Sequence, residues 1–248
     1  DLHSFPTRRS SDLYSCLDTS EHPFVGASAE LPDGGHLFTG RISLDSHPWL
    51  ADHAVQGTVL LPGTGFLELA LHAAQQTGDD TVDELILHAP LAVTADDAVQ
   101  LRLSLTPPAD DGRRTITIHS RSNGAEWTHN ATGTLSTAEA ISESETITTW
   151  PPANATPIDV DDLHAKLAAQ GLTYGPAFHG LKTAWKHNDG GQIYAEAELP
   201  ETTGSDPTAY RLHPALLDAA LHTLAARQGD GPVRLPFSWS GEIGRAHV

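Results

Sequence analysis

The most constraining feature of this chain is that one pattern occurs twice: a single long apolar helix lies among short strand-like segments. In the first half, apolar residues recur at helical spacing over about 65–76, and Gly78 ends the segment. In the second half, the same spacing covers 213–227. A chain of 248 residues, 39% of them hydrophobic, can bury a core around both helices. The pattern predicts an α+β protein made of two similar parts.

Alternating strand-like runs surround the first helix. Two of them precede it, at 35–44 and 55–61, and four follow it, at 82–93, 99–106, 115–121 and 127–135. The clearest period of two lies in Thr115-Ile-Thr-Ile-His119. The links between the later runs are too short for a crossover helix, so we expect antiparallel pairing.

A segment rich in Ser, Thr, Glu and Pro separates the two halves. It covers 136–157 and predicts a linker between units at 14–135 and 158–242. The second unit is expected to begin with a helix over 158–170 that ends at Gly171. A turn at 174–178 and strands at 181–187 and 192–199 then lead to its long helix.

His53 begins the first segment that could carry chemistry, with Gly57 and Pro62 at fixed distances behind it. Histidine suits general-base chemistry because its ordinary pKa lies near neutral pH. The chain has 15 histidines, and most must be surface or packing residues. Gly57 permits close backbone approach and Pro62 suits entry into a helix, so the spacing favours a functional role for His53.

Asp218 lies in the second such segment, His213-Pro-Ala-Leu-Leu-Asp218, and His222 follows one turn later. The i to i+4 spacing places both side chains on one helix face, beside Leu217 and Leu221. We therefore expect the carboxyl group in largely apolar surroundings. The alternative is a surface ion pair that contributes little. Together, an imidazole and a carboxyl group from separate halves can move a proton off one carbon and onto a leaving oxygen.

These two segments resemble the HxxxGxxxxP and HPALLD signatures of dehydratase domains from modular polyketide synthases. The resemblance extends from about His22 to Trp239 and includes Tyr174-Gly-Pro and Leu235-Pro-Phe-Ser-Trp239. It implies a double hotdog, in which two tandem antiparallel sheets each wrap around a long helix. The second hotdog is expected to be incomplete.

The resemblance also implies an activity, which is removal of water from a 3-hydroxyacyl thioester to give the 2-enoyl thioester. His53 would be the base that removes the proton next to the carbonyl, and Asp218 the acid that protonates the leaving hydroxyl. The remaining residues matched to the family's substrate site are Gly57, Pro62, Tyr174, Gly175, Pro176 and His222. Of these, Tyr174 would donate a hydrogen bond, while His222 would hold the acid or the hydroxyl in place.

The resemblance implies neither a metal nor a nucleotide cofactor, because the substrate is carried on the phosphopantetheine of an acyl carrier protein. It implies that carrier protein and neighbouring synthase domains as partners, and a homodimer. Acidic residues outnumber basic residues by 32 to 14, which argues against nucleic-acid binding. The same negative charge leads us to expect only weak, local contact with an acidic carrier protein.

Three other functions remain open at this point. A metal hydrolase could use His53, His213, Asp218 and His222, although the chain has no HExxH or other compact ligand motif. A second alternative is a non-catalytic structural or dimerisation module of a synthase. A related double-bond isomerase or cyclase would use the same two residues as the dehydratase.

The remaining expectations concern the location of the protein and the two ends of the chain. No apolar run is long enough for a bilayer helix, and no secretion signal is visible, so we expect a cytoplasmic protein without membrane contact. Cys16 is the only cysteine, which excludes an internal disulfide. Residues 1–13 and 243–248 resemble translated sequencing adapter, and the chain lacks methionine. We therefore expect a domain that is cut short after Gly241 or Glu242 and that has an exposed sheet edge. An inactive fragment is the alternative to an active dehydratase.

Overall fold

The computed structural model describes residues 17–137, 149–189, 191–226 and 237–243. Eight strands form one antiparallel sheet in the order β1-β2-β3-β7-β8-β9-β6-β14. Their bounds are Asp18–Thr19 (β1), Ala27–Glu30 (β2), His36–Ile42 (β3), Thr81–Leu87 (β6), Val99–Leu105 (β7), Arg114–Arg121 (β8), Thr128–Ser136 (β9) and Ser238–Ile243 (β14). Antiparallel pairing is confirmed, and the strand predicted over 82–93 ends earlier, at Leu87.

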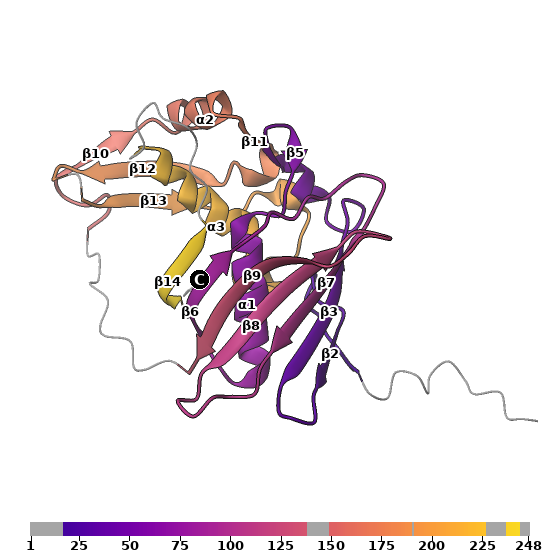
Figure 1. Cartoon of the computed structure of the whole chain (residues 1–248). Coiled ribbons are helices and arrows are strands. Elements are labelled where there is room, and N and C mark those ends of the chain that lie inside the picture. The colour runs from indigo at the N-terminus through magenta and orange to yellow at the C-terminus, as the bar shows by residue number, and fades with distance from the viewer. Residues whose placement is uncertain (1–16, 138–148, 190, 227–236, 244–248) are drawn as a thin grey trace, which may run out of the picture.

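Helix α1 (Gly63–Thr77) lies along one face of this sheet, which curves around it (Figure 1). Every residue from Thr64 to Ala74 is buried, so the helix is covered on all sides rather than along one stripe. Strand β7 supplies part of the opposing surface, because Val99, Leu101 and Leu103 point into the core while the residues between them point outward. As predicted, α1 ends at Gly78, whose φ of 79° is left-handed.

The second half contains a three-stranded antiparallel sheet and two helices. The sheet has the order β10-β12-β13, with bounds Ala155–Ile158, Leu181–His187 and Ile193–Ala197. Strand β10 lies inside the predicted linker, so that prediction was wrong for 155–157; residues 138–148 of the linker lie outside the described part. Helix α2 (Val160–Ala169) begins where the Asp159 side chain accepts hydrogen bonds from two backbone N–H groups.

The second long helix is shorter than predicted. Helix α3 covers Pro214–Leu221 and continues as the 3₁₀ segment η6, His222–Ala226. His213 is the N-cap residue, and its Nδ1 accepts a hydrogen bond from the Ala215 N–H. At the other end, the N–H of His222 faces the carbonyls of residues 218–220, so the last turn tightens into 3₁₀ geometry.

Strands from both halves form a third sheet in the order β11-β4-β5, with bounds Leu172–Tyr174, His53–Val55 and Thr58–Val59. The single strand predicted over 55–61 is in fact the β4–β5 hairpin. Gln56 and Gly57 form its two-residue loop with φ values of 49° and 79°, as in a type I′ turn. His53 is the first residue of strand β4.

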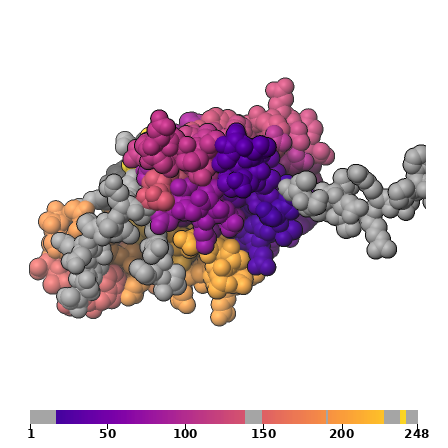
Figure 2. All heavy atoms as spheres, turned by 90° about the horizontal axis from the view of Figure 1, so that it is seen from below, coloured from indigo at the N-terminus to yellow at the C-terminus, as the bar shows by residue number. Residues whose placement is uncertain are grey.

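The two halves are in contact: orange and yellow spheres of the second half lie against purple spheres of the first half (Figure 2), and α1 packs on α3. Strand β14 of the second half pairs with β6, so it joins the first-half sheet at one end. It includes Ile243, the first of the C-terminal residues that resemble adapter sequence. Residues 1–13 and 244–248 lie outside the described part of the chain. No helix among the described residues is both long and apolar enough to cross a bilayer.

Candidate active site

A cavity of about 360 Å³ lies between the two halves and has mainly apolar walls. The first half contributes His53, Val55, Leu60, Leu61, Gly63, Thr64, Phe66, Leu87, His88, Ala89 and Pro90 to its lining. The second half contributes Leu167, Leu172, Tyr174, Asp218, Leu221, His222, Leu224, Ala225, Phe237 and Trp239. The structure thus brings His53, Tyr174, Asp218 and His222 to one cavity.

His53 begins β4 and is 6% exposed. Its Nδ1 lies 2.9 Å from the carbonyl oxygen of Leu60. A carbonyl only accepts hydrogen bonds, so Nδ1 carries the hydrogen and Nε2 keeps its lone pair in the neutral ring. The rings of Tyr174 and Phe178 pack against the imidazole. This arrangement leaves Nε2 as an oriented proton acceptor.

Asp218 lies in α3 and is 8% exposed, in agreement with the apolar surroundings expected from its helix. Its Oδ2 is 3.3 Å from Nε2 of His222. The start of α3 is tied to α1, because the hydroxyl of Thr64 donates a hydrogen bond to the Pro214 carbonyl at 3.0 Å. Helix packing therefore places the carboxyl group against a cavity whose other wall belongs to the first half.

Tyr174 lies in β11, directly opposite His53 of β4. Its ring is also 4.0 Å from that of His222, measured between centroids. Burial raises the pKa of the Tyr174 hydroxyl well above its ordinary value of 10, and the nearby Asp218 carboxylate raises it further. The hydroxyl therefore stays protonated and can donate a hydrogen bond in the cavity.

Gly57 and Pro62 are not among the residues that line the cavity. Gly57 occupies the left-handed position of the β4–β5 turn, and Pro62 directly precedes α1. Both shape the segment that carries His53 and Leu60. Their predicted contact with substrate stays a prediction.

Gly175 and Pro176 are also absent from the cavity lining. Hydrogen bonds from their segment to Asp52 hold them in a different place. The N–H of Gly175 donates to the Asp52 backbone carbonyl, and the N–H of Ala177 donates to the Asp52 side chain at 2.8 Å. A Cβ on Gly175 would collide with that side chain. Asp52 belongs to none of the motifs recognised in the sequence, but in the structure it fastens the Tyr174 segment to the His53 segment.

His213 does not join the cavity, which bears on the metal-hydrolase alternative. Its ring packs between Trp49 and Tyr210, with centroid distances of 4.8 and 4.4 Å. Burial lowers the pKa of His213 to about 4. Within the described residues, no group of three or more His, Cys, Asp or Glu side chains is arranged to hold a metal ion. The four residues considered as ligands are therefore not assembled.

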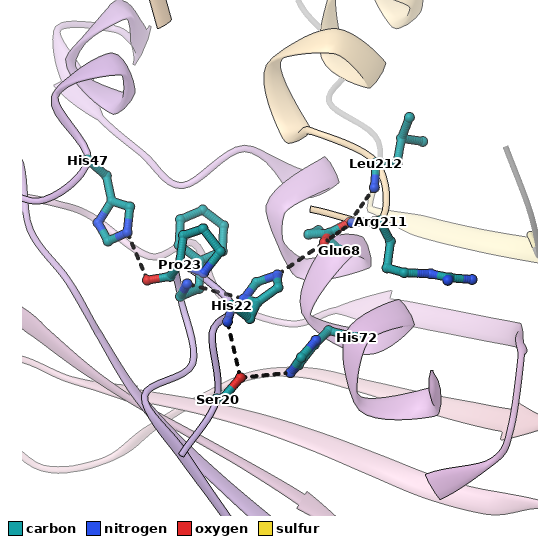
Figure 3. Close-up of polar contacts among 9 residues, drawn as sticks. Ser20, His22, Pro23, His47, Glu68, His72, Arg211 and Leu212 are labelled. Carbon is teal, nitrogen blue, oxygen red and sulfur yellow. Dashed lines mark hydrogen bonds and ion pairs between the residues drawn. The ribbon is translucent and has the colours of Figure 1, made fainter. Parts of the chain in front are cut away.

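A second buried polar cluster, missed from the sequence, lies at Glu68 of α1 (Figure 3). Glu68 is 1% exposed and accepts hydrogen bonds from the N–H groups of Arg211 and Leu212 at 2.7 and 2.8 Å. Its third contact is Nε2 of His22 at 3.0 Å; His22 Nδ1 accepts from the Phe24 N–H, so Nε2 carries the hydrogen. The glutamate's place in an apolar helix was the available signal. The cluster anchors the segment that leads into α3, and thus the position of Asp218.

Two family models match the chain. The model described as "Polyketide synthase dehydratase domain" matches residues 22–121, and the one described as "Polyketide synthase dehydratase N-terminal domain" matches residues 142–241. Polyketide synthase GfsB of Streptomyces halstedii is 47% identical over 243 residues, which are 93% of this chain and 4% of GfsB. The chain therefore spans only a small part of that curated relative.

Solved structures give the same result. One, from a study of dehydratase substrate selection for the borrelidin and fluvirucin polyketide synthases, is 46% identical with a TM-score of 0.85, covering 91% of this chain and 79% of that chain. The dehydratase of the CurK module of curacin synthase is 28% identical with a TM-score of 0.72, covering 82% and 73%. It was also solved as two inactive mutants, one Asp to Asn and one His to Phe. These similarities confirm the predicted α+β double hotdog fold.

Proposed function

Since the chain belongs to the dehydratase domains of type I polyketide synthases, and so to polyketide chain processing, we propose that it removes water from a 3-hydroxyacyl thioester to give the 2-enoyl thioester. One observation carries the proposal: His53 and Asp218 come from opposite halves and line the same apolar cavity. A base and an acid in one cavity suit an elimination, in which one carbon loses a proton while its neighbour loses a hydroxyl group.

His53 is the base in this proposal. Its Nδ1–H is engaged by the Leu60 carbonyl, so Nε2 takes the proton from the carbon next to the thioester carbonyl. The electrons of that C–H bond form the new double bond, and the C–O bond on the neighbouring carbon breaks. A histidine fixed in one tautomer can perform this step at neutral pH.

Asp218 is the acid and gives its proton to the departing oxygen, which leaves as water. The step ends with protonated His53 and ionised Asp218, and exchange with water restores both groups. Nε2 of His222 lies 3.3 Å from Asp218 Oδ2, close enough to hold the carboxyl group in place during this step. Support comes from the CurK dehydratase, where an Asp to Asn change and a His to Phe change each gave a mutant described as inactive.

The mainly apolar lining of the cavity suits an acyl chain on a flexible thioester arm. Leu60, Leu167 and Leu221 offer apolar surface to the chain. The polar side chains His53, Tyr174, His222 and Asp218 contact one another in that order. We propose that the substrate is presented on the phosphopantetheine of an acyl carrier protein, that the chemistry needs no metal or nucleotide, and that the domain works as a homodimer beside other synthase domains.

The test is incubation of the protein with a 3-hydroxyacyl thioester on a carrier protein, followed by mass spectrometry of the bound acyl group. We expect loss of one water with the wild type and none with His53→Ala or Asp218→Asn. The control His119→Ala removes a histidine from β8 that does not line the cavity, and it should turn over normally.

A wild-type product of unchanged mass would refute the dehydration. It would favour double-bond migration or cyclisation if the product's structure had changed. Normal turnover by His53→Ala or Asp218→Asn would remove that residue from its assigned role.

A further inference from the structure

We infer that His164 is a positioning residue, which holds His222 in the tautomer that keeps the proton of Asp218 available to the substrate. This inference rests on the proposed function. His164 was not identified from the sequence, because it lies on α2 in a segment without any recognised motif. The structure places it behind His222, on the side away from Asp218.

The three side chains form a continuous hydrogen-bonded row. Nε2 of His222 lies 3.3 Å from Asp218 Oδ2, and Nδ1 of His222 lies 3.3 Å from His164 Nε2. The His222 ring is only 2% exposed, so these two partners take the place of water at its nitrogens. The two imidazole rings are nearly perpendicular, at 83°. Each His222 nitrogen therefore faces one defined neighbour.

The direction of the hydrogen bonds decides where the acid's proton lies. If His222 carries its hydrogen on Nε2, it donates to Oδ2, and the Asp218 proton remains on Oδ1. If His222 instead carries its hydrogen on Nδ1, its bare Nε2 accepts the proton of Oδ2, and that proton points away from the substrate. A donor at His222 Nδ1 selects the first arrangement, because Nδ1 must then be the acceptor.

His164 can supply that donor. Its ring stacks on His179 of the neighbouring segment, with centroids 4.6 Å apart and an angle of 13°, which fixes the direction of its Nε2. Burial, with smaller effects from His222 and His179, lowers the pKa of His164 to about 4, although Asp161 acts in the opposite direction. The ring is therefore neutral at pH 7 and carries one hydrogen. The inference places that hydrogen on Nε2, 3.3 Å from His222 Nδ1, which makes His164 the donor.

Nitrogen NMR of the histidine rings tests the inference directly in the full chain at pH 7. In the wild type we expect the His222 signals of a hydrogen on Nε2 and a bare Nδ1. In His164→Ala we expect a mixture of both tautomers. In His164→Gln we expect the wild-type pattern, because the amide nitrogen of glutamine can occupy the place of Nε2. A wild-type His222 with its hydrogen on Nδ1 overturns the inference without any variant.

Kinetics provide the second readout. For His164→Ala we expect kcat to fall about fivefold, the scale of one lost hydrogen bond, with KM unchanged. His164→Gln and the same-helix control Lys166→Ala should both match the wild type. Wild-type kcat in His164→Ala overturns the positioning role but leaves the dehydration standing. Failure of the wild type to release water overturns the proposed function instead, and the ring signals still decide the tautomer.

Discussion

His53 and Tyr174 are direct partners on the antiparallel strands β4 and β11, and their rings meet edge to face with centroids 5.6 Å apart. Backbone hydrogen bonds between the strands therefore set the separation of two polar side chains from opposite halves of the chain. Neither residue can move away from the other without breaking the small sheet. This pairing makes the base and its neighbouring hydroxyl one rigid unit.

The Tyr174 hydroxyl should assist the reaction without contributing much to stability. We expect Tyr174→Phe to lower kcat/KM by about tenfold, because one hydrogen-bond donor in the cavity is lost. The pKa of Tyr174 lies well above 10, so the wild-type rate should show no ionisation of this group as the pH rises to 10. Steady-state kinetics across pH check both statements. A wild-type rate for the Phe variant would show that the hydroxyl is a bystander.

Gly175 should tolerate no side chain, because Asp52 occupies the space that a Cβ would need. We expect Gly175→Ala to push Asp52 aside, break its bond to the Ala177 N–H and lower the free energy of unfolding by about 2 kcal/mol. Urea unfolding followed by fluorescence measures this. Gly26→Ala is the matched control, since the nearest atom to its added Cβ lies at 4.0 Å. Equal stability of the two variants would contradict the packing argument.

Glu68 should be essential for fastening the two halves together. We expect Glu68→Gln to cost about 2 kcal/mol of unfolding free energy, because an amide N–H would face one of the donors that the carboxylate now satisfies. The comparison variant is Glu84→Gln on β6, whose side chain is exposed and which should be neutral. Chemical denaturation of both proteins measures their unfolding free energies. A Glu68→Gln protein as stable as the wild type would show that Glu68 does not anchor the segment that leads into α3.

Stability should fall in mild acid, in part because of His213. Burial lowers its pKa from 6.5 in the unfolded chain to about 4 in the folded protein. Between these values only the unfolded chain binds the proton, so stability present above pH 6.5 is lost as the pH falls to 4. The expected slope is about 1 kcal/mol per pH unit.

His213→Asn tests this slope, because asparagine can still cap α3 but does not titrate. The variant should lose less stability than the wild type between pH 6.5 and 4, even if its unfolding free energy at pH 7 is lower. Denaturation at several pH values gives the two slopes. Parallel slopes would mean that another group causes the acid sensitivity; His72 also has a pKa lowered to about 4.

Local sequence patterns predicted several elements correctly and singled out the two side chains to which the proposed chemistry is assigned. Apolar spacing located α1 and its end at Gly78, and alternation located β7 and β8, because burial of one face imposes a period on the residues that occupy it. The spacing of residues around His53 and Asp218 selected them from many histidines and acids. Each of these signals lies within a short stretch of chain, where residues that are close in the sequence are also close in space.

Tertiary structure alone decided which distant residues meet. The pairing of β4 with β11 places Tyr174 beside His53, and the packing of α2 on η6 places His164 behind His222. Sequence patterns also could not separate residues that line the cavity from residues that hold those residues in place. Gly175, for example, does not line the cavity, and it packs closely against Asp52. The contacts between β4 and β11 and between His222 and His164 join residues far apart in the chain. Their geometry follows from how the helices and sheets pack together, which no local pattern records.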